Sequence, residues 1–412
     1  MAISYIQTPQ TWTPINNDMI YYVQTNSAIS NLYLEVYIQS QLVSRSKLVV
    51  DDNGFAYCDI KQFLQSFIKN NQLYFTEGLI WKTLPDLNFY VNYQVKCRET
   101  IGGTEYPDST RNAFNGQIPF VDFVEYDMQY NTENSSSKFL TYSPRTIYTD
   151  FLRTNFLSYI EGSQSASKIR IRTYEGTTTP THVFEFTITD ASSKAGIIAL
   201  SKFTIGYNPI QWQDVSTEWN LMEDATWDTV GGFILNDSVT QYDVCLLNSS
   251  DVQITELFTF IRKDYCSKYE KTNIFWQNSL GGYDSYTFNM VKKTRYNIDR
   301  KSIQSLPYTF NNSGYSLHNG GVFNASNQNY YTNYTEGVLL NSDLLTDEEH
   351  AWMWELIKSH FIYVEQVING TTYYVPAVIK DTTYEPKKTR VDGLQNIAIE
   401  LEYGYDNIRI TR

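Results

Sequence analysis

The chain is poor in the residues from which metal centres and disulfide frameworks are built. It has four cysteines and four histidines among 412 residues. No C-x-x-C pair and no H-E-x-x-H spacing occurs, so we expect no metal site, and we also expect no cofactor. We interpret the cysteines as buried thiols of a protein made in a reducing cytoplasm. They are Cys58, Cys97, Cys245 and Cys266.

Sequence motifs that hold phosphate or activate a nucleophile are missing as well. The chain has no G-x-x-x-x-G-K-[ST], no G-x-G-x-x-G and no G-x-S-x-G. Its first residues, "MAISYIQTPQTWTP", lack the basic start and the apolar run of a signal peptide. No stretch approaches the roughly 20 apolar residues of a membrane helix. We therefore expect a protein that is not an enzyme and has no membrane span.

Charged residues are scarce, and most of them are acidic. They make up 19% of the chain, with 45 Asp and Glu against 32 Lys and Arg, which gives a net charge of −13. A groove that tracks a nucleic-acid backbone needs clustered lysine and arginine. This balance argues against such a groove over a large area. It also fits free subunits that repel one another.

Tyrosine is the residue present in excess. The chain has 34 tyrosines, with 22 phenylalanines and 8 tryptophans. Aromatic residues favour strands and interfaces, where one end of the side chain is buried and the other meets water. A length of 412 residues exceeds one ordinary domain. We therefore predict a mainly β fold with minor α, built from several domains that include β-sandwich-like modules and a C-terminal α+β module.

Residues 1–120 predict a β-sandwich-like domain with one short helix. In "NLYLEVYIQ", alternate residues from Leu32 to Ile38 share one face, and Glu35 lies on the other. "DIKQFLQSFI" has apolar residues at helical spacing, with Asp59 as the expected N-cap. "NFYVNYQVKC" alternates again. We interpret "NGQIPF", near residue 120, as the domain boundary.

Residues 121–290 predict a central β-rich domain, with strands in "SKIRIRTYEG", "HVFEFTITD", "SKFTIGYNP", "QYDVCLLNSS" and "ITELFTFIRK". The composition then shifts to Asn, Gly and Tyr with little apolar periodicity over residues 291–337. We interpret this segment as an extended arm or loop that packs on another subunit. A mobile surface loop is the alternative.

Residues 338–412 predict a compact α+β module made of a helix, a hairpin and a strand. The helix has a capping box, in which Thr346 caps and Glu349 reaches back. The hairpin turns at Asn369-Gly370, because this pair tolerates positive φ. The final strand lies in "QNIAIELEYGY", which alternates apolar and polar residues.

The stretch "NIFWQNSLGGYDSYTFNM" raises three possibilities, which are a phosphate cradle, a sugar-binding groove and a corner between two strands. The glycine pair lacks the lysine of a phosphate loop. Asp284 could belong to a carboxylate pair for glycoside hydrolysis, but a role in the turn is favoured. The aromatics could stack on sugars, but core or subunit interface is favoured. The candidate turn or assembly residues are Trp276, Asn278, Gly281, Gly282, Tyr283, Asp284 and Phe288.

Three phrases of the sequence resemble virion structural proteins of phages of Bacteroidetes hosts, the crAss-like phages among them. They are "IQTPQTWTPINNDMIYYV" with "LYLEVYI", then "FWQNSLGGYDSYTF" after a strand with Cys266, and "LLTDEEHAWMWELIKS" with "YYVPAVIKDTTYEPKK" and "IAIELEY". Together they cover about half of the chain in the expected order. Trp276-Gln277 stand where two other residues are expected. Residues 125–240 and 300–335 carry no resemblance.

This resemblance implies a structural subunit of a short phage tail, located in the virion and made in the bacterial host cytoplasm. It implies a ring, adaptor or hub protein below the portal. The implied partners are other copies of the chain in a sixfold or twelvefold ring and neighbouring tail or portal-proximal proteins. DNA would pass the ring transiently at ejection. No catalytic residue is implied. The alternatives are a carbohydrate-binding adhesin of the tail and a glycan-cleaving enzyme.

Overall fold

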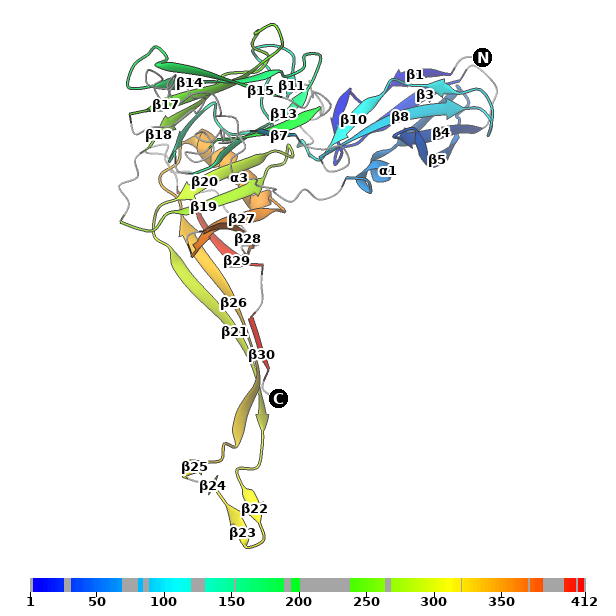
Figure 1. The fold of residues 1–412 in the computed structure, drawn as a ribbon. Coiled ribbons are helices and arrows are strands. Elements are labelled where there is room, and N and C mark those ends of the chain that lie inside the picture. The colour runs from blue at the N-terminus through cyan, green and yellow to red at the C-terminus, as the bar shows by residue number, and fades with distance from the viewer. Residues whose placement is uncertain are drawn as a thin grey trace, which may run out of the picture. The chain divides into compact units, whose positions relative to one another are not determined.

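A computed structural model shows a mainly β chain with few helical residues, which confirms the expected fold class (Figure 1). Contacts divide the chain into two compact units. Unit 1 comprises Met1–Tyr265, Trp276–Tyr286 and Ala351–Ser359, and unit 2 comprises Cys266–Phe275, Thr287–His350 and His360–Arg412. The structure describes residues 3–25, 31–68, 81–83, 89–119, 130–151, 153–188, 194–200, 238–263, 268–319, 321–369, 371–380, 396–404 and 407–410.

Unit 1 begins with two sheets whose inner faces share one core. The first sheet has the order β1 (Ser4–Gln7), β3 (Ile20–Gln24), β6 (Phe55–Asp59). The second has the order β2 (Trp12–Pro14), β10 (Arg111–Phe114), β8 (Tyr90–Arg98), β4 (Asn31–Ile38), β5 (Gln41–Val49), with β9 (Tyr106–Pro107) on β8. The alternation expected in β4 and β8 is confirmed, because Leu34, Val36 and Val95 are buried. Of "NGQIPF", where the boundary near residue 120 was expected, only Phe120 lies outside the described residues.

Glu35 departs from the alternation of β4. The pattern placed it on the outer face, yet its side chain is fully buried. Arg45 Nε and Arg98 Nε lie 2.7 and 3.0 Å from its carboxylate oxygens, and the Tyr37 hydroxyl donates to it at 2.7 Å. These long neighbouring side chains thus shield the carboxylate from water and also provide the hydrogen bonds and opposite charges that it needs when buried.

The short helix α1 (Lys61–Gln65) follows β6, as predicted, but its N-cap is Ile60. Asp59, the expected cap, lies one position earlier. Its Oδ1 still accepts hydrogen bonds from the Lys61 N–H at 3.0 Å and the Met19 N–H at 3.1 Å. The carboxylate therefore accepts hydrogen bonds both from the first turn of the helix and from the residue that precedes β3.

The central part of unit 1 contains two further sheets. One has the order β11 (Asn131–Thr132), β13 (Asn155–Glu161), β16 (Ala195–Leu200), β7 (Trp81–Thr83). The other has the order β12 (Thr146–Thr149), β18 (Phe258–Arg262), β17 (Gln241–Leu247), β14 (Lys168–Tyr174), β15 (His182–Thr187). Four of the five expected strands of this region are confirmed as β14, β15, β17 and β18. The fifth, "SKFTIGYNP", lies outside the described residues.

The largest sheet includes most strands of unit 2. Its order is β20 (Tyr283–Phe288), β19 (Thr272–Gln277), β27 (Ile362–Ile368), β28 (Thr371–Ile379), β29 (Ala398–Tyr403), β26 (Asn327–Asn341), β21 (Lys293–Gln304), with β30 (Asn407–Ile410) on β26. The hairpin β27–β28 and the strand β29 confirm the expected C-terminal elements. Asn369 has a φ of 53° at the hairpin turn, while Gly370 lies outside the described residues.

Helix α3 (Asp347–Lys358) confirms the capping box. The Glu349 N–H donates to Thr346 Oγ1 at 3.2 Å, and the Thr346 N–H donates to Glu349 Oε2 at 2.9 Å. Two backbone N–H groups at the start of the helix therefore have side-chain acceptors. Among the described residues, no helix is long and apolar enough to span a membrane.

The segment expected as an arm or loop is a long antiparallel β-ribbon. Its strands are β21 and β26, whose pairing runs from Lys293 opposite Leu339 to Gln304 opposite Asn327. Beyond that pair lie two small hairpins, β22 (Thr309–Asn311) with β23 (Gly314–Ser316) and β24 (His318–Asn319) with β25 (Val322–Phe323). We call residues 293–341 the ribbon. It extends away from the rest of its sheet (Figure 1).

Candidate functional site

The Gly-Gly segment forms the tight corner expected between two strands, here β19 and β20. The Asn278 N–H donates to the Gly282 carbonyl at 2.9 Å, and the Gly281 N–H donates to the Asn278 carbonyl at 3.0 Å. Asn278 Oδ1 accepts the Gly282 N–H at 3.0 Å. The side chain that closes the turn is thus Asn278, and Asp284, for which a role in the turn was expected, contacts the turn through Asn278.

Both glycines are required by close approach of other backbone segments. Gly281 has a φ of 80°, and a Cβ atom there would stand 1.9 Å from the Asn115 carbonyl oxygen. A Cβ atom on Gly282 would stand 2.3 Å from the Leu140 carbonyl oxygen. The N–H groups of both glycines also donate to Asn278 already, so they are not available to hold a phosphate. The glycines permit packing rather than ligand binding.

Asp284 is buried beside this turn and accepts three hydrogen bonds. Thr141 Oγ1 donates to Oδ1 at 2.7 Å, while Asn278 Nδ2 and Trp352 Nε1 each donate to Oδ2 at 3.0 Å. Burial raises the pKa of Asp284 to about 6, although the three hydrogen bonds act in the opposite direction. The carboxyl group orients Asn278 and Trp352, and through Asn278 it supports the turn.

The aromatic residues of the segment belong to the interior. Trp276, Tyr283 and Phe288 are 0%, 3% and 1% exposed. Trp276 packs against Trp352 of α3, with ring centroids 5.4 Å apart. Residues this buried do not form a platform on which a sugar could stack. Exposed aromatic side chains would favour the adhesin alternative, and these three side chains are buried.

Three parts of unit 1 meet at the turn. The Gln117 N–H donates to the Ser279 carbonyl at 2.5 Å. The Asn278 side-chain amide donates to the Leu140 carbonyl at 2.9 Å. The Ser279 N–H donates to Glu355 Oε2 at 2.9 Å. Leu140 and Glu355 are 138 and 76 residues away from their partners. Nothing in the local sequence marks these contacts, so sequence analysis did not find them.

The described residues contain no cluster of His, Cys, Asp and Glu that could hold a metal ion. Cys97 and Cys245 are buried free thiols, and Cys58 is a half-buried one. Burial raises the pKa of all three thiols, which keeps them protonated and unreactive at neutral pH. Cys266 lies outside the described residues.

The ribbon carries a concentration of exposed apolar side chains. Every residue of β21 is exposed. Near the tip, Phe310, Tyr315 and Phe323 are 69%, 69% and 75% exposed. Scattered apolar residues are ordinary on protein surfaces, but a group confined to one projecting element indicates an interaction surface. The exposed apolar side chains of the ribbon are Tyr296, Ile298, Ile303, Leu306, Tyr308, Phe310, Tyr315, Leu317, Val322, Phe323 and Tyr330.

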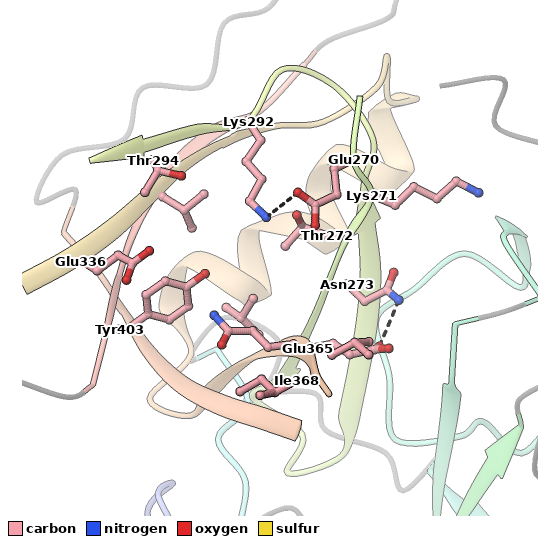
Figure 2. Close-up of a pocket in the computed structure, with 14 residues that line it drawn as sticks. Glu270, Lys271, Thr272, Asn273, Lys292, Thr294, Glu336, Glu365, Ile368 and Tyr403 are labelled. Carbon is pink, nitrogen blue, oxygen red and sulfur yellow. Dashed lines mark hydrogen bonds and ion pairs between the residues drawn. The ribbon is translucent and has the colours of Figure 1, made fainter. Parts of the chain in front are cut away.

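Unit 2 also contains a polar pocket of about 340 Å³ at the base of the ribbon (Figure 2). Thr272 of β19, Glu336 of β26, Glu365 of β27 and Tyr403 of β29 contribute to its walls. Asn273 Nδ2 donates to Glu365 Oε2 at 3.0 Å. Burial raises the pKa of Glu365. Burial also raises the pKa of Tyr403, and the negative charge of Glu336 raises it further.

Comparisons with known proteins identify no relative by sequence. No protein family and no curated protein matches the chain. Among solved structures, a match to the fibronectin(III)-like modules of Clostridium thermocellum CbhA has 7% identity and a TM-score of 0.16, and covers 65% of this chain and 98% of that one. At this TM-score the likeness carries no argument about fold or function.

Proposed function

We propose that the chain is a structural subunit of a phage virion, a tail ring, adaptor or hub protein that forms a symmetric oligomer below the portal and helps to line the conduit for DNA ejection. The observation that carries the proposal is the ribbon, a projecting element with exposed apolar side chains on its strands and at its tip. The resemblance of three phrases to phage virion proteins supports the same assignment.

The ribbon has two features that suit assembly. Its apolar side chains lose contact with water when a neighbour covers them, at about 25 cal/mol for each Å² buried. In addition, β21 ends the order of its sheet among the described strands, so its outer backbone edge is open to pairing. A closed ring needs head-to-tail contacts, in which an element of one copy docks on a different surface of the next. A projecting ribbon is suited to such a contact.

The experiment that tests this function measures the mass of the purified full-length chain in solution and images it by negative stain. We expect a sixfold or twelvefold ring. Replacing Phe310, Tyr315 and Phe323 by serine should shift the protein to monomers without lowering its melting temperature, because all three side chains are exposed. The matched control replaces Val49 and Tyr57, which are 81% and 73% exposed outside the ribbon.

Two results would contradict the proposal. One is a trimeric fibre, which would favour the adhesin alternative. The other is a ribbon variant that assembles as well as the unchanged protein, which would show that the exposed apolar side chains of the ribbon do not contribute to the interface.

A further inference from the structure

We propose that the polar pocket of unit 2 binds an organic cation, an alkylammonium or guanidinium group, between the carboxylates of Glu336 and Glu365. These two residues lie on different strands and line the same cavity. Figure 2 shows them on different sides of the space that the labelled residues surround. Within the described part of the chain neither carboxylate forms an ion pair, and Glu365 accepts a hydrogen bond from the neutral Asn273 amide.

The two lysines that line the pocket do not neutralise this pair. Lys292 Nζ lies 3.3 Å from Glu270 Oε2, so its charge is matched by a third carboxylate. Figure 2 shows the Lys271 side chain directed away from the other labelled residues. Glu336 and Glu365 therefore leave an excess of negative charge inside a partly buried cavity, where water screens it less than at the open surface.

A second observation, independent of the carboxylates, also indicates a ligand. Thr272 is 3% exposed, lines the pocket, and has a hydroxyl group without a hydrogen-bond partner. Figure 2 shows this side chain directed into the space between the labelled residues. A buried hydroxyl without a partner destabilises the folded protein, and the N–H donor of a bound cation would give that hydroxyl a hydrogen bond.

The shape and lining of the pocket suit a cation on a short alkyl stem. A primary ammonium has three donors and no acceptor, so it requires acceptor groups of the kind that the two carboxylates and the Thr272 hydroxyl provide. The buried side chains of Val338 and Val364 and the ring of Tyr403 provide apolar contacts for methylene groups. A cavity of about 340 Å³ holds a small amine or one side chain and excludes a folded domain.

The same chemistry could come from a free diamine or polyamine, or from a lysine or arginine side chain of another chain. The test uses the full-length protein and isothermal titration calorimetry with two probes. Putrescine represents the free amine, and Nα-acetyl-lysine methylamide represents the side chain. The neutral diol 1,4-butanediol, which has the same carbon chain as putrescine, is the ligand control.

We expect at least one of the two amines to bind and the diol to give no heat. Binding of putrescine alone assigns the free amine, and binding of the lysine derivative alone assigns the side chain. The double variant with Glu336→Gln and Glu365→Gln should bind at least about tenfold more weakly, because both charged acceptors are lost. The control variant Glu348→Gln makes the same chemical change at an exposed position of α3 and should bind normally.

Three outcomes would overturn the inference. They are the absence of binding by either amine, equal binding of the diol and the amines, and equal affinity in the double variant and the unchanged protein. Circular dichroism and the melting temperature of the double variant show whether it is folded. If that variant fails to fold, Thr272→Val provides the independent test, since it removes the unpaired hydroxyl and should weaken amine binding without removing a charge.

Discussion

Asp284 is a buried acid whose surroundings accommodate both of its protonation states. As a carboxylate it accepts hydrogen bonds from Thr141, Asn278 and Trp352. When it is protonated, its Oδ1 can donate to Thr141 Oγ1 instead, because the Thr141 hydroxyl also lies 2.9 Å from Ser143 Oγ and can turn to donate there. Protonation therefore breaks no buried hydrogen bond.

The raised pKa of Asp284 gives a pH dependence with a definite sign. Its folded value of about 6 exceeds the ordinary 3.8, so the folded state binds more protons between these values. The free energy of unfolding should therefore fall as pH rises from about 4 to 7, by up to about 3 kcal/mol for a shift of about two units. Denaturant unfolding at pH 4, 5, 6, 7 and 8 measures this slope.

The variant Asp284→Asn isolates that contribution. Its amide can donate to Thr141 and accept from Asn278 and Trp352, as the protonated acid does. We expect the variant to be at least as stable as the unchanged protein at pH 8 and to have a flatter pH profile. Asp52→Asn, at an exposed position, should keep the original profile. Parallel profiles for all three proteins would show that Asp284 does not titrate in this range.

A comparison of Gly281 with Gly102 separates the cost of a left-handed φ from the cost of a steric contact with the Cβ atom. Gly281→Ala combines a left-handed φ of 80° with a Cβ atom 1.9 Å from the Asn115 carbonyl oxygen. Gly102→Ala has a similar φ of 81° but no atom within 4 Å of its Cβ. We expect a loss of about 1 kcal/mol at Gly102 and about 4 kcal/mol at Gly281 in denaturant unfolding. Equal losses would show that the contact with Asn115 relaxes without cost.

At the scale of elements, the patterns that predicted structure correctly are those with a local cause. Alternation in β4 and β8 follows from burial of one face, and the capping box of Thr346 and Glu349 depends on residues three apart. The burial of Glu35 was not predictable, because it depends on Arg45 and Arg98, and Arg98 lies 63 residues away. The partners of the Gly-Gly turn are distant in sequence for the same reason.

The ribbon was recognised as an arm by its composition, but its strands were not predicted. The alternation that reveals a strand requires one buried face. Every residue of β21 is exposed, so its sequence carries no such signal. Pairing with β26 stabilises this strand through backbone hydrogen bonds, which every residue except proline can both donate and accept. Composition therefore identified the segment, and only the structure gave its secondary structure.

The register of the ribbon defines a deletion that separates folding from assembly. The last pair is Gln304 with Asn327, so residues 305–326 can be replaced by an Asn-Gly turn without unpairing either strand. We expect an unchanged melting temperature and loss of the ring in solution, because the deletion removes most of the exposed apolar side chains near the tip. A large fall in melting temperature would show that the small hairpins support the sheet.

At the scale of the whole molecule, the proposed assembly would have to overcome the repulsion between like-charged copies. Each chain carries a net charge of −13. The tip of the ribbon, residues 305–326, contains no Asp, Glu, Lys or Arg and carries several exposed apolar side chains. Burial of such a surface depends little on moderate salt, whereas repulsion between acidic copies is screened. An acidic surface would also keep DNA from adhering to a conduit built from these subunits. Both expectations follow from the same charge balance.

The net negative charge of the chain predicts how salt affects the proposed oligomer. Raising NaCl from about 50 to 300 mM shortens the screening distance from roughly 14 to 6 Å, so the protein concentration at half-assembly should fall severalfold. Analytical ultracentrifugation across this range measures that concentration. Glycerol added at low salt, as a control for general solvent effects, should not reproduce the change. If salt instead dissociates the ring, complementary ion pairs rather than the apolar ribbon hold the copies together, and the serine variants of the ribbon should then assemble normally.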